Sequence, residues 1–178
     1  ARDFLVGKAT NLSGWSWPKL AVAVIATLYF FWCAFDPYQW HFIDGVNLVI
    51  HEAGHVVFSP LGEFMMIAGG SLFQLIIPAG FWAYFLYQRQ QYSAALVLFW
   101  VGESILNVSV YAADAQALQL PLLGGGDSMH DWNYLLTSLN LLQSTAVVAI
   151  VLRGLGTSVI LLAALRSIRF ARKASFKL

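Results

Sequence analysis

The sequence predicts an all-α integral membrane protein: a bundle of about four transmembrane helices, with one further helix that enters the membrane and returns. Of its 178 residues, 59% are hydrophobic and only 11% are charged. Soluble domains are about 45–50% apolar and about 25% charged, and a chain this short cannot hide such an excess in a core. Seven Trp, seven Tyr and thirteen Phe suit the aromatic belts of a bilayer. Because no polar linker divides the chain, we expect residues 1–178 to form a single integral membrane domain in contact with lipid.

Four apolar stretches are long enough to cross a bilayer, which takes about 20 residues of helix. They are residues 20–35, 65–87, 92–118 and 144–168. Pro18 precedes the first stretch, where proline suits the first turn of a helix, and Asp36-Pro37 closes it. After a glycine-containing loop, residues 132–142 are typical of a short helix at the membrane interface.

The distribution of charge predicts the topology. The net charge is only +1, which argues against a nucleic-acid partner. No Lys or Arg occurs in residues 36–65 or 115–143, and cytoplasmic segments are the ones that carry basic residues. If residues 43–60 crossed the membrane, the basic C-terminus would face the wrong side. We therefore expect that segment to dip in and return, both termini to be cytoplasmic, and His51 and His130 to lie towards the non-cytoplasmic face.

The most informative motif is His51-Glu52-Ala53-Gly54-His55, an H-E-x-x-H sequence. Residues four apart share one face of a helix, so both imidazoles can bind one Zn²⁺ ion. Glu52 is the expected catalytic residue, a general base towards a water molecule whose pKa zinc lowers to about 7. Ionisable residues inside a membrane are costly and point to function. The alternative is a polar cluster that holds helices together by hydrogen bonds.

A third metal ligand has two candidates. We expect His130, because its loop lies at the same face as the motif and imidazole nitrogen suits zinc. Asp114 is the alternative, at the end of a polar stripe on the third apolar stretch. Asn107 and Tyr111 in that stripe are expected to hydrogen-bond the ligands, as outer partners of metal sites do. Asp131 is expected either to join them or to cap the helix that follows.

These motifs resemble the core of the site-2 protease family of intramembrane zinc metalloproteases. The resemblance rests on His51 to His55, on Gly62 and on the run Ala68-Gly69-Gly70-Ser71-Leu72-Phe73-Gln74. Members of that family have H-E-x-G-H in a membrane helix, then a glycine-containing loop and a distal aspartate. Residues 107–114 are similar to the distal motif in spacing. The resemblance implies hydrolysis of peptide bonds within or beside the membrane.

We therefore expect a membrane-embedded zinc metalloprotease-like protein. Its partners would be membrane lipids and a membrane-protein substrate or a larger membrane complex. The alternative is a non-catalytic accessory subunit of such a complex that keeps a zincin-like metal site. A haem or quinone protein is disfavoured, because histidines four residues apart on one helix would crowd a single porphyrin.

Overall fold

A computed structural model of the chain describes residues 14–121 and 129–172. Within these ranges the structure is helical, without a strand, which confirms the predicted all-α fold. The α-helices are α1 (Trp17–Phe35), α2 (Phe42–Phe58), α3 (Glu63–Tyr87), α4 (Gln91–Ala113), α5 (Asp131–Ser138) and α6 (Thr145–Phe170), with short 3₁₀ turns η1 (Ser59–Leu61) and η2 (Leu142–Ser144). The three consecutive glycines predicted to form a loop lie outside the described residues.

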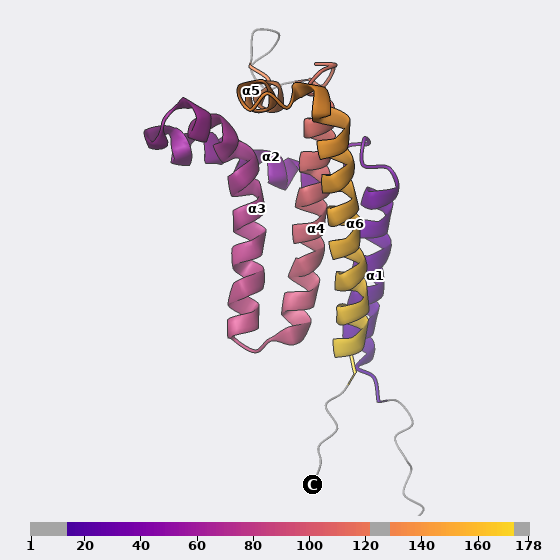
Figure 1. Cartoon of the computed structure of the whole chain (residues 1–178). Coiled ribbons are helices and arrows are strands. Elements are labelled where there is room, and N and C mark those ends of the chain that lie inside the picture. Colours follow the sequence, from indigo (N-terminus) through magenta and orange to yellow (C-terminus); the bar gives the residue numbers. More distant parts are fainter. Residues whose placement is uncertain (1–13, 122–128, 173–178) are drawn as a thin grey trace, which may run out of the picture.

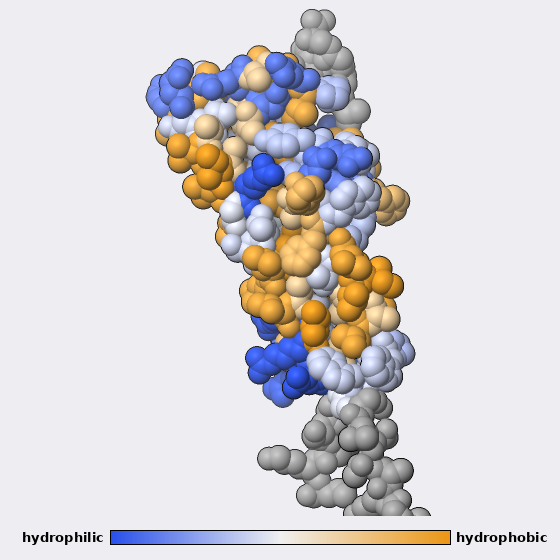
Figure 2. All heavy atoms as spheres, turned by 90° about the vertical axis from the view of Figure 1, so that its right-hand side faces the viewer, coloured by the Kyte–Doolittle hydropathy of each residue, from blue (hydrophilic) through white to orange (hydrophobic). Residues whose placement is uncertain are grey.

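The four helices α1, α3, α4 and α6 are long and apolar enough to cross a membrane. They lie side by side in Figure 1 and match the four predicted stretches. Figure 2 shows one face of the bundle, where apolar residues cover much of the middle and hydrophilic residues gather towards the two ends. The chain is thus an integral membrane protein by the length, composition and arrangement of its helices.

Two helices end earlier than the sequence predicts. Helix α4 ends at Ala113 rather than near residue 118, because the carboxylate of Asp114 accepts hydrogen bonds from the backbone N–H groups of Gln119 and Leu120 at 2.9 Å each. These bonds turn the chain away from the helix axis. Helix α5 ends at Ser138, two residues before Asn140 adopts a left-handed conformation with φ of 57°. Left-handed residues commonly terminate helices.

Helix α4 is the most buried of the four spans and packs closely on α6. A Cβ atom on Gly156 would lie 2.8 Å from the carbonyl oxygen of Gly102, so the two backbones nearly touch. Small residues of this kind allow close approach of membrane helices. The core around this contact consists of Leu98, Phe99, Leu106, Ile160, Ala163 and Ala164.

Helix α2 does not run along the bundle but lies across it, near the end that also carries α5 (Figure 1). The opposite end holds the start of α1, the α3–α4 turn and the end of α6. There the backbone N–H of Ser16 donates to the carbonyl of Ala171 at 2.9 Å, which ties the two ends of the described chain together. The H-E-x-x-H motif and α5 therefore meet at one end of the bundle.

Candidate metal centre

Helices α2 and α3 pack closely where a glycine of one helix faces a glycine of the other. A Cβ atom on Gly69 would lie 2.6 Å from the Cβ of Phe58 and 2.7 Å from the carbonyl oxygen of Gly54. A Cβ atom on Gly54, the glycine within the H-E-x-x-H motif, would in turn overlap the carbonyl oxygen of Gly69 and lie 2.7 Å from the Cβ of Phe73, so a side chain there would push the two helices apart. The close contact fixes α2 on α3, which supplies hydrogen-bond partners to both histidines of the motif.

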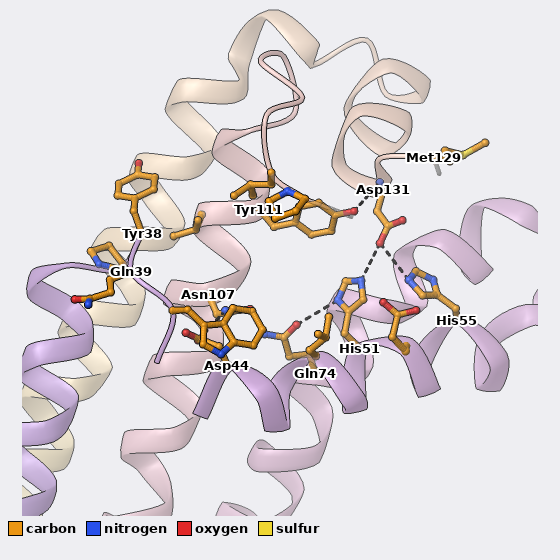
Figure 3. Close-up of a pocket in the computed structure, with 17 residues that line it drawn as sticks. Tyr38, Gln39, Asp44, His51, His55, Gln74, Asn107, Tyr111, Met129 and Asp131 are labelled. Carbon is orange, nitrogen blue, oxygen red and sulfur yellow. Dashed lines mark hydrogen bonds and ion pairs between the residues drawn. The ribbon is translucent and has the colours of Figure 1, made fainter. Parts of the chain in front are cut away.

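His51, His55 and Asp131 come together at the end of the bundle (Figure 3). Nε2 of His51 lies 2.9 Å from Oδ2 of Asp131, and Nε2 of His55 lies 3.2 Å from the same oxygen. All three potential ligand atoms lie within 4.8 Å of one another. His51 and Asp131 are buried and His55 is half-buried, so the group is shielded from solvent on most sides. These are two imidazole nitrogens and one carboxylate oxygen converging on one point.

The hydrogen bonds on the far side of each imidazole determine which nitrogen is available. Nδ1 of His51 lies 3.2 Å from Oε1 of Gln74, and Nδ1 of His55 lies 2.9 Å from the carbonyl oxygen of Met66. Both partners are oxygen acceptors, so each Nδ1 carries a hydrogen and donates it. When a metal ion binds, each ring would therefore offer the lone pair of Nε2 on the side that faces Asp131, the arrangement that outer partners impose on metal-binding histidines.

The hydrogen bond between His51 and Gln74 is the first of a chain of side-chain hydrogen bonds that extends into the bundle. Nε2 of Gln74 donates to Oδ1 of Asn107 at 2.8 Å, and Nδ2 of Asn107 donates to Oδ1 of Asp44 at 2.9 Å. Because an oxygen of Asp44 accepts this hydrogen, Asn107 presents its own oxygen to Gln74, and Gln74 presents its oxygen to His51. Asp44 is held in turn by the backbone N–H of His41, at 2.6 Å. A carboxylate at the start of α2 thus fixes the tautomer of a ligand in the middle of the same helix.

Charge couples His55 to Asp131. The hydrogen bond to Asp131, with a further contribution from the bond to Met66, raises the pKa of His55 to about 9. Burial alone would raise the pKa of Asp131, but the hydrogen bonds from His51 and His55 outweigh it and hold that pKa below its ordinary value. Without a metal, the site therefore holds a positive charge on His55 against a negative charge on Asp131 at neutral pH.

Helix α5 is held over the motif by two further contacts. The backbone N–H of Asp131 donates to the hydroxyl of Tyr111 at 3.2 Å, and the indole N–H of Trp132 donates to Oγ of Ser71 at 3.1 Å. Asp131 is the first residue of α5, so its side chain projects from the helix start towards α2 (Figure 3). Contacts from α4 and α3 together place the carboxylate.

The structure places His130 and Asp114 together, apart from this group. His130 is the N-cap of α5: its Nδ1 accepts from the backbone N–H of Asn133 at 3.2 Å, and its Nε2 lies 3.2 Å from Oδ2 of Asp114. Asp114 also accepts the two backbone N–H groups described above. The residue that joins His51 and His55 is Asp131, rather than His130 or Asp114, and the N-cap position is taken by His130 rather than by Asp131.

Glu52 lies beside the metal-ligand group without belonging to it. It is exposed and lines a cavity of about 620 Å³ that also borders His51, His55 and Asp131. Cavities of this size are typical of small-molecule sites. Other residues that line the cavity include Tyr38, Gln39, Trp40, Leu48, Val110, Leu120, Pro121 and Met129. The carboxylate of Glu52, the candidate metal site and several apolar side chains thus line the same cavity.

The donor set fits zinc. Two imidazole nitrogens and one carboxylate oxygen form a known class of catalytic zinc site, which leaves a fourth position open. Calcium and magnesium prefer oxygen ligands alone. Gly70 makes room for the ligand, because a Cβ atom there would lie 2.5 Å from Nε2 of His51.

The sequence reasoning assigned no contact with the histidines to four groups around the site. Gly70 and Gln74 entered it only as part of the family resemblance, and Asp44 and the carbonyl of Met66 had no role in it. A signal existed for one pair, since Gly70 and Gln74 are four residues apart and so share a face of α3. A small residue followed by an amide on that face is consistent with a helix packed against a polar group. Asp44 and Met66 had no such signal, because their roles depend on how α2 lies on its neighbours.

Comparisons with protein-family models, with curated proteins and with solved structures find no match for this chain. The resemblance of the H-E-x-G-H segment to site-2 proteases thus stays a prediction. The candidate site stands on its own geometry.

Proposed function

We propose that this protein is a zinc-dependent peptidase of the membrane, with His51, His55 and Asp131 as the metal ligands. The observation that carries the proposal is the convergence of three ligand atoms within 4.8 Å beside a cavity that Glu52 also lines. Three protein ligands leave one coordination position free, which distinguishes catalytic from structural zinc sites. A structural site would use that position for a fourth side chain.

The proposed reaction is hydrolysis of an amide bond. A bound zinc ion supplies Lewis acidity, which lowers the pKa of water and polarises a carbonyl group. Glu52 takes a proton from the attacking water as the water oxygen bonds to the carbonyl carbon. Glu52 then passes that proton to the amide nitrogen as the carbon–nitrogen bond breaks, which gives a carboxylic acid and an amine. Asp131 is ionised and acts as a ligand, and both oxygens of Asp44 accept hydrogen bonds from His41 and Asn107. Glu52 is therefore the carboxylate of the cavity left to move the proton.

The proposed membrane orientation follows from charge. The described basic residues at the end opposite the metal centre are Lys19, Arg89, Arg166, Arg169 and Arg172. An excess of basic residues marks the cytoplasmic side. The termini would then be cytoplasmic, the metal centre would lie near the non-cytoplasmic face, and the exposed apolar side chains of α1 and α6 would contact lipid.

The test uses purified protein in detergent, loaded with zinc and incubated with internally quenched peptides of mixed sequence. Wild type is expected to cleave, and Glu52→Gln is expected to bind zinc equally well but to lose cleavage. Glu63→Gln is the matched control. Like Glu52, Glu63 is an exposed glutamate on a helix, but it lies at the start of α3 and does not line the cavity. Undiminished cleavage by Glu52→Gln would refute the assigned role of Glu52. Zinc binding by wild type without any cleavage would favour the accessory-subunit alternative.

A further inference from the structure

The amide hydrolysis proposed above requires more than a metal and a base. As water adds to the carbonyl carbon, negative charge develops on the carbonyl oxygen. Enzymes stabilise this charge with preorganised hydrogen-bond donors, and loss of one donor typically costs about 10²–10³-fold in kcat. A donor for this oxygen must lie beside the metal ligands and have a hydrogen that no other group of the protein accepts.

Most polar groups around the cavity do not meet that requirement. No lysine or arginine is among its lining residues within the described parts of the chain. Gln74 and Asn107 each commit one amide hydrogen to the chain that ends at Asp44, which holds both amide groups in the plane of that chain and directs them along it. Both ring nitrogens of His130 are also engaged, with Asp114 and with the start of α5. Gln39 lies on the far side of the cavity from the two histidines (Figure 3).

Tyr111 has a hydroxyl hydrogen that meets this requirement. Its hydroxyl oxygen accepts the backbone N–H of Asp131 at 3.2 Å, and among the described residues no acceptor takes its own hydrogen. The tyrosine ring contacts both the metal-ligand group and the neighbouring His130–Asp114 pair, because its centroid lies 5.7 Å from that of His51 and 4.4 Å from that of His130. Figure 3 shows the hydroxyl pointing towards Asp131, the residue whose carboxylate contacts both histidines.

We propose that Tyr111 is a catalytic residue that donates a hydrogen bond to the carbonyl oxygen of the substrate as that oxygen becomes negatively charged. This inference rests on the proposed peptidase function. It gives Tyr111 a direct role towards substrate, beyond the ligand-supporting role expected from its place on the polar stripe. The hydroxyl is positioned before substrate arrives, because the Asp131 backbone holds its oxygen and leaves its hydrogen free to rotate into the cavity.

The test compares Tyr111→Phe with Tyr134→Phe, a control on α5 whose tyrosine does not line the cavity. The first readout is cleavage: Tyr111→Phe is expected to lose about 10²–10³-fold in kcat with little change in KM. The second readout does not require turnover. In the zinc-loaded Glu52→Gln background, Tyr111→Phe is expected to bind a phosphinic peptide, which mimics the tetrahedral carbon and its charged oxygen, at least about tenfold more weakly. Binding of the corresponding substrate peptide and of zinc is expected to be unchanged.

The outcomes separate this inference from the proposed function. Cleavage by wild type that equals cleavage by Tyr111→Phe overturns the role of Tyr111 and leaves the peptidase assignment standing. Absence of cleavage by wild type counts against the peptidase assignment, and the phosphinic peptide then still decides the role of Tyr111. Equal binding of that peptide by both proteins, or no binding at all, overturns it. A loss of zinc affinity in Tyr111→Phe would show that the tyrosine only positions Asp131.

Discussion

A single methyl group at position 70 provides a sharp test of where the metal binds. In Gly70→Ala the new carbon would lie 2.5 Å from Nε2 of His51, whereas ordinary contacts begin at 3.4 Å. The His51 ring must therefore move by about 1 Å if the helices stay in place. Zinc–nitrogen bonds are about 2.0–2.1 Å long and tolerate deviations of about 0.2 Å. The displacement is several times larger than the bond can absorb.

We expect the dissociation constant for zinc to rise more than about 100-fold in Gly70→Ala, beyond the range typical for loss of an outer hydrogen bond. Competition with a chromophoric chelator, using protein in detergent, measures this constant. The matched control is Gly80→Ala in the same helix, where a Cβ atom would meet nothing within 4 Å. Its zinc affinity is expected to equal that of wild type. If Gly70→Ala melts like the control and binds zinc within about threefold of wild type, the ion does not bind at Nε2 of His51.

Further predictions concern the outer hydrogen bonds and protons of the site. Gln74→Leu removes the acceptor that fixes the His51 tautomer and is expected to weaken zinc binding about 10–100-fold. The control is Gln88→Leu, at an exposed glutamine of the same region, and equal zinc affinities of the two variants would refute the role of Gln74. Because the pKa of His55 is about 9, zinc binding at pH 7 should release close to one proton, and affinity should rise about tenfold per pH unit until about pH 9. Calorimetry in buffers of different ionisation enthalpy measures the proton, and a release near zero would contradict the coupling. In the metal-free protein, a raised histidine pKa stabilises the fold fully below about pH 6.5, and this contribution disappears as the pH rises through about 9. Melting temperatures across this range should therefore converge between wild type and Asp131→Asn at high pH, and a difference that does not depend on pH would refute the ion pair.

The helices and the paired histidines were predictable from the sequence because both depend on local periodicity. Apolar stretches of about 20 residues specify spans, and a spacing of four residues puts His51 and His55 on one helical face. The absence of basic residues from 36–65 and 115–143 also placed α2 and α5 at one end of the bundle. These signals require no knowledge of how one helix packs on another.

The residue that joins the two histidines was not predictable in this way. His130 and Asp131 are neighbours, and the sequence favoured the first as ligand and gave the second a supporting or capping role. Aspartate is the more usual N-cap, yet in the structure His130 caps α5 and Asp131 faces the motif. The choice depends on the rotation of α5, which is set by its contacts with Tyr111 and Ser71 on other helices. The periodicity of a single sequence does not predict contacts between helices.

The most direct measurement of the proposed metal centre is the zinc affinity of Asp131→Asn beside that of His130→Asn. Asparagine at position 131 keeps the size of the side chain and removes the charge. Asparagine at position 130 retains an acceptor for the start of α5 and removes the imidazole. A centre formed by His51, His55 and Asp131 requires that Asp131→Asn lose more than about 100-fold in affinity and that His130→Asn stay within about tenfold of wild type. Loss of zinc from His130→Asn, with zinc retained by Asp131→Asn, would contradict that centre.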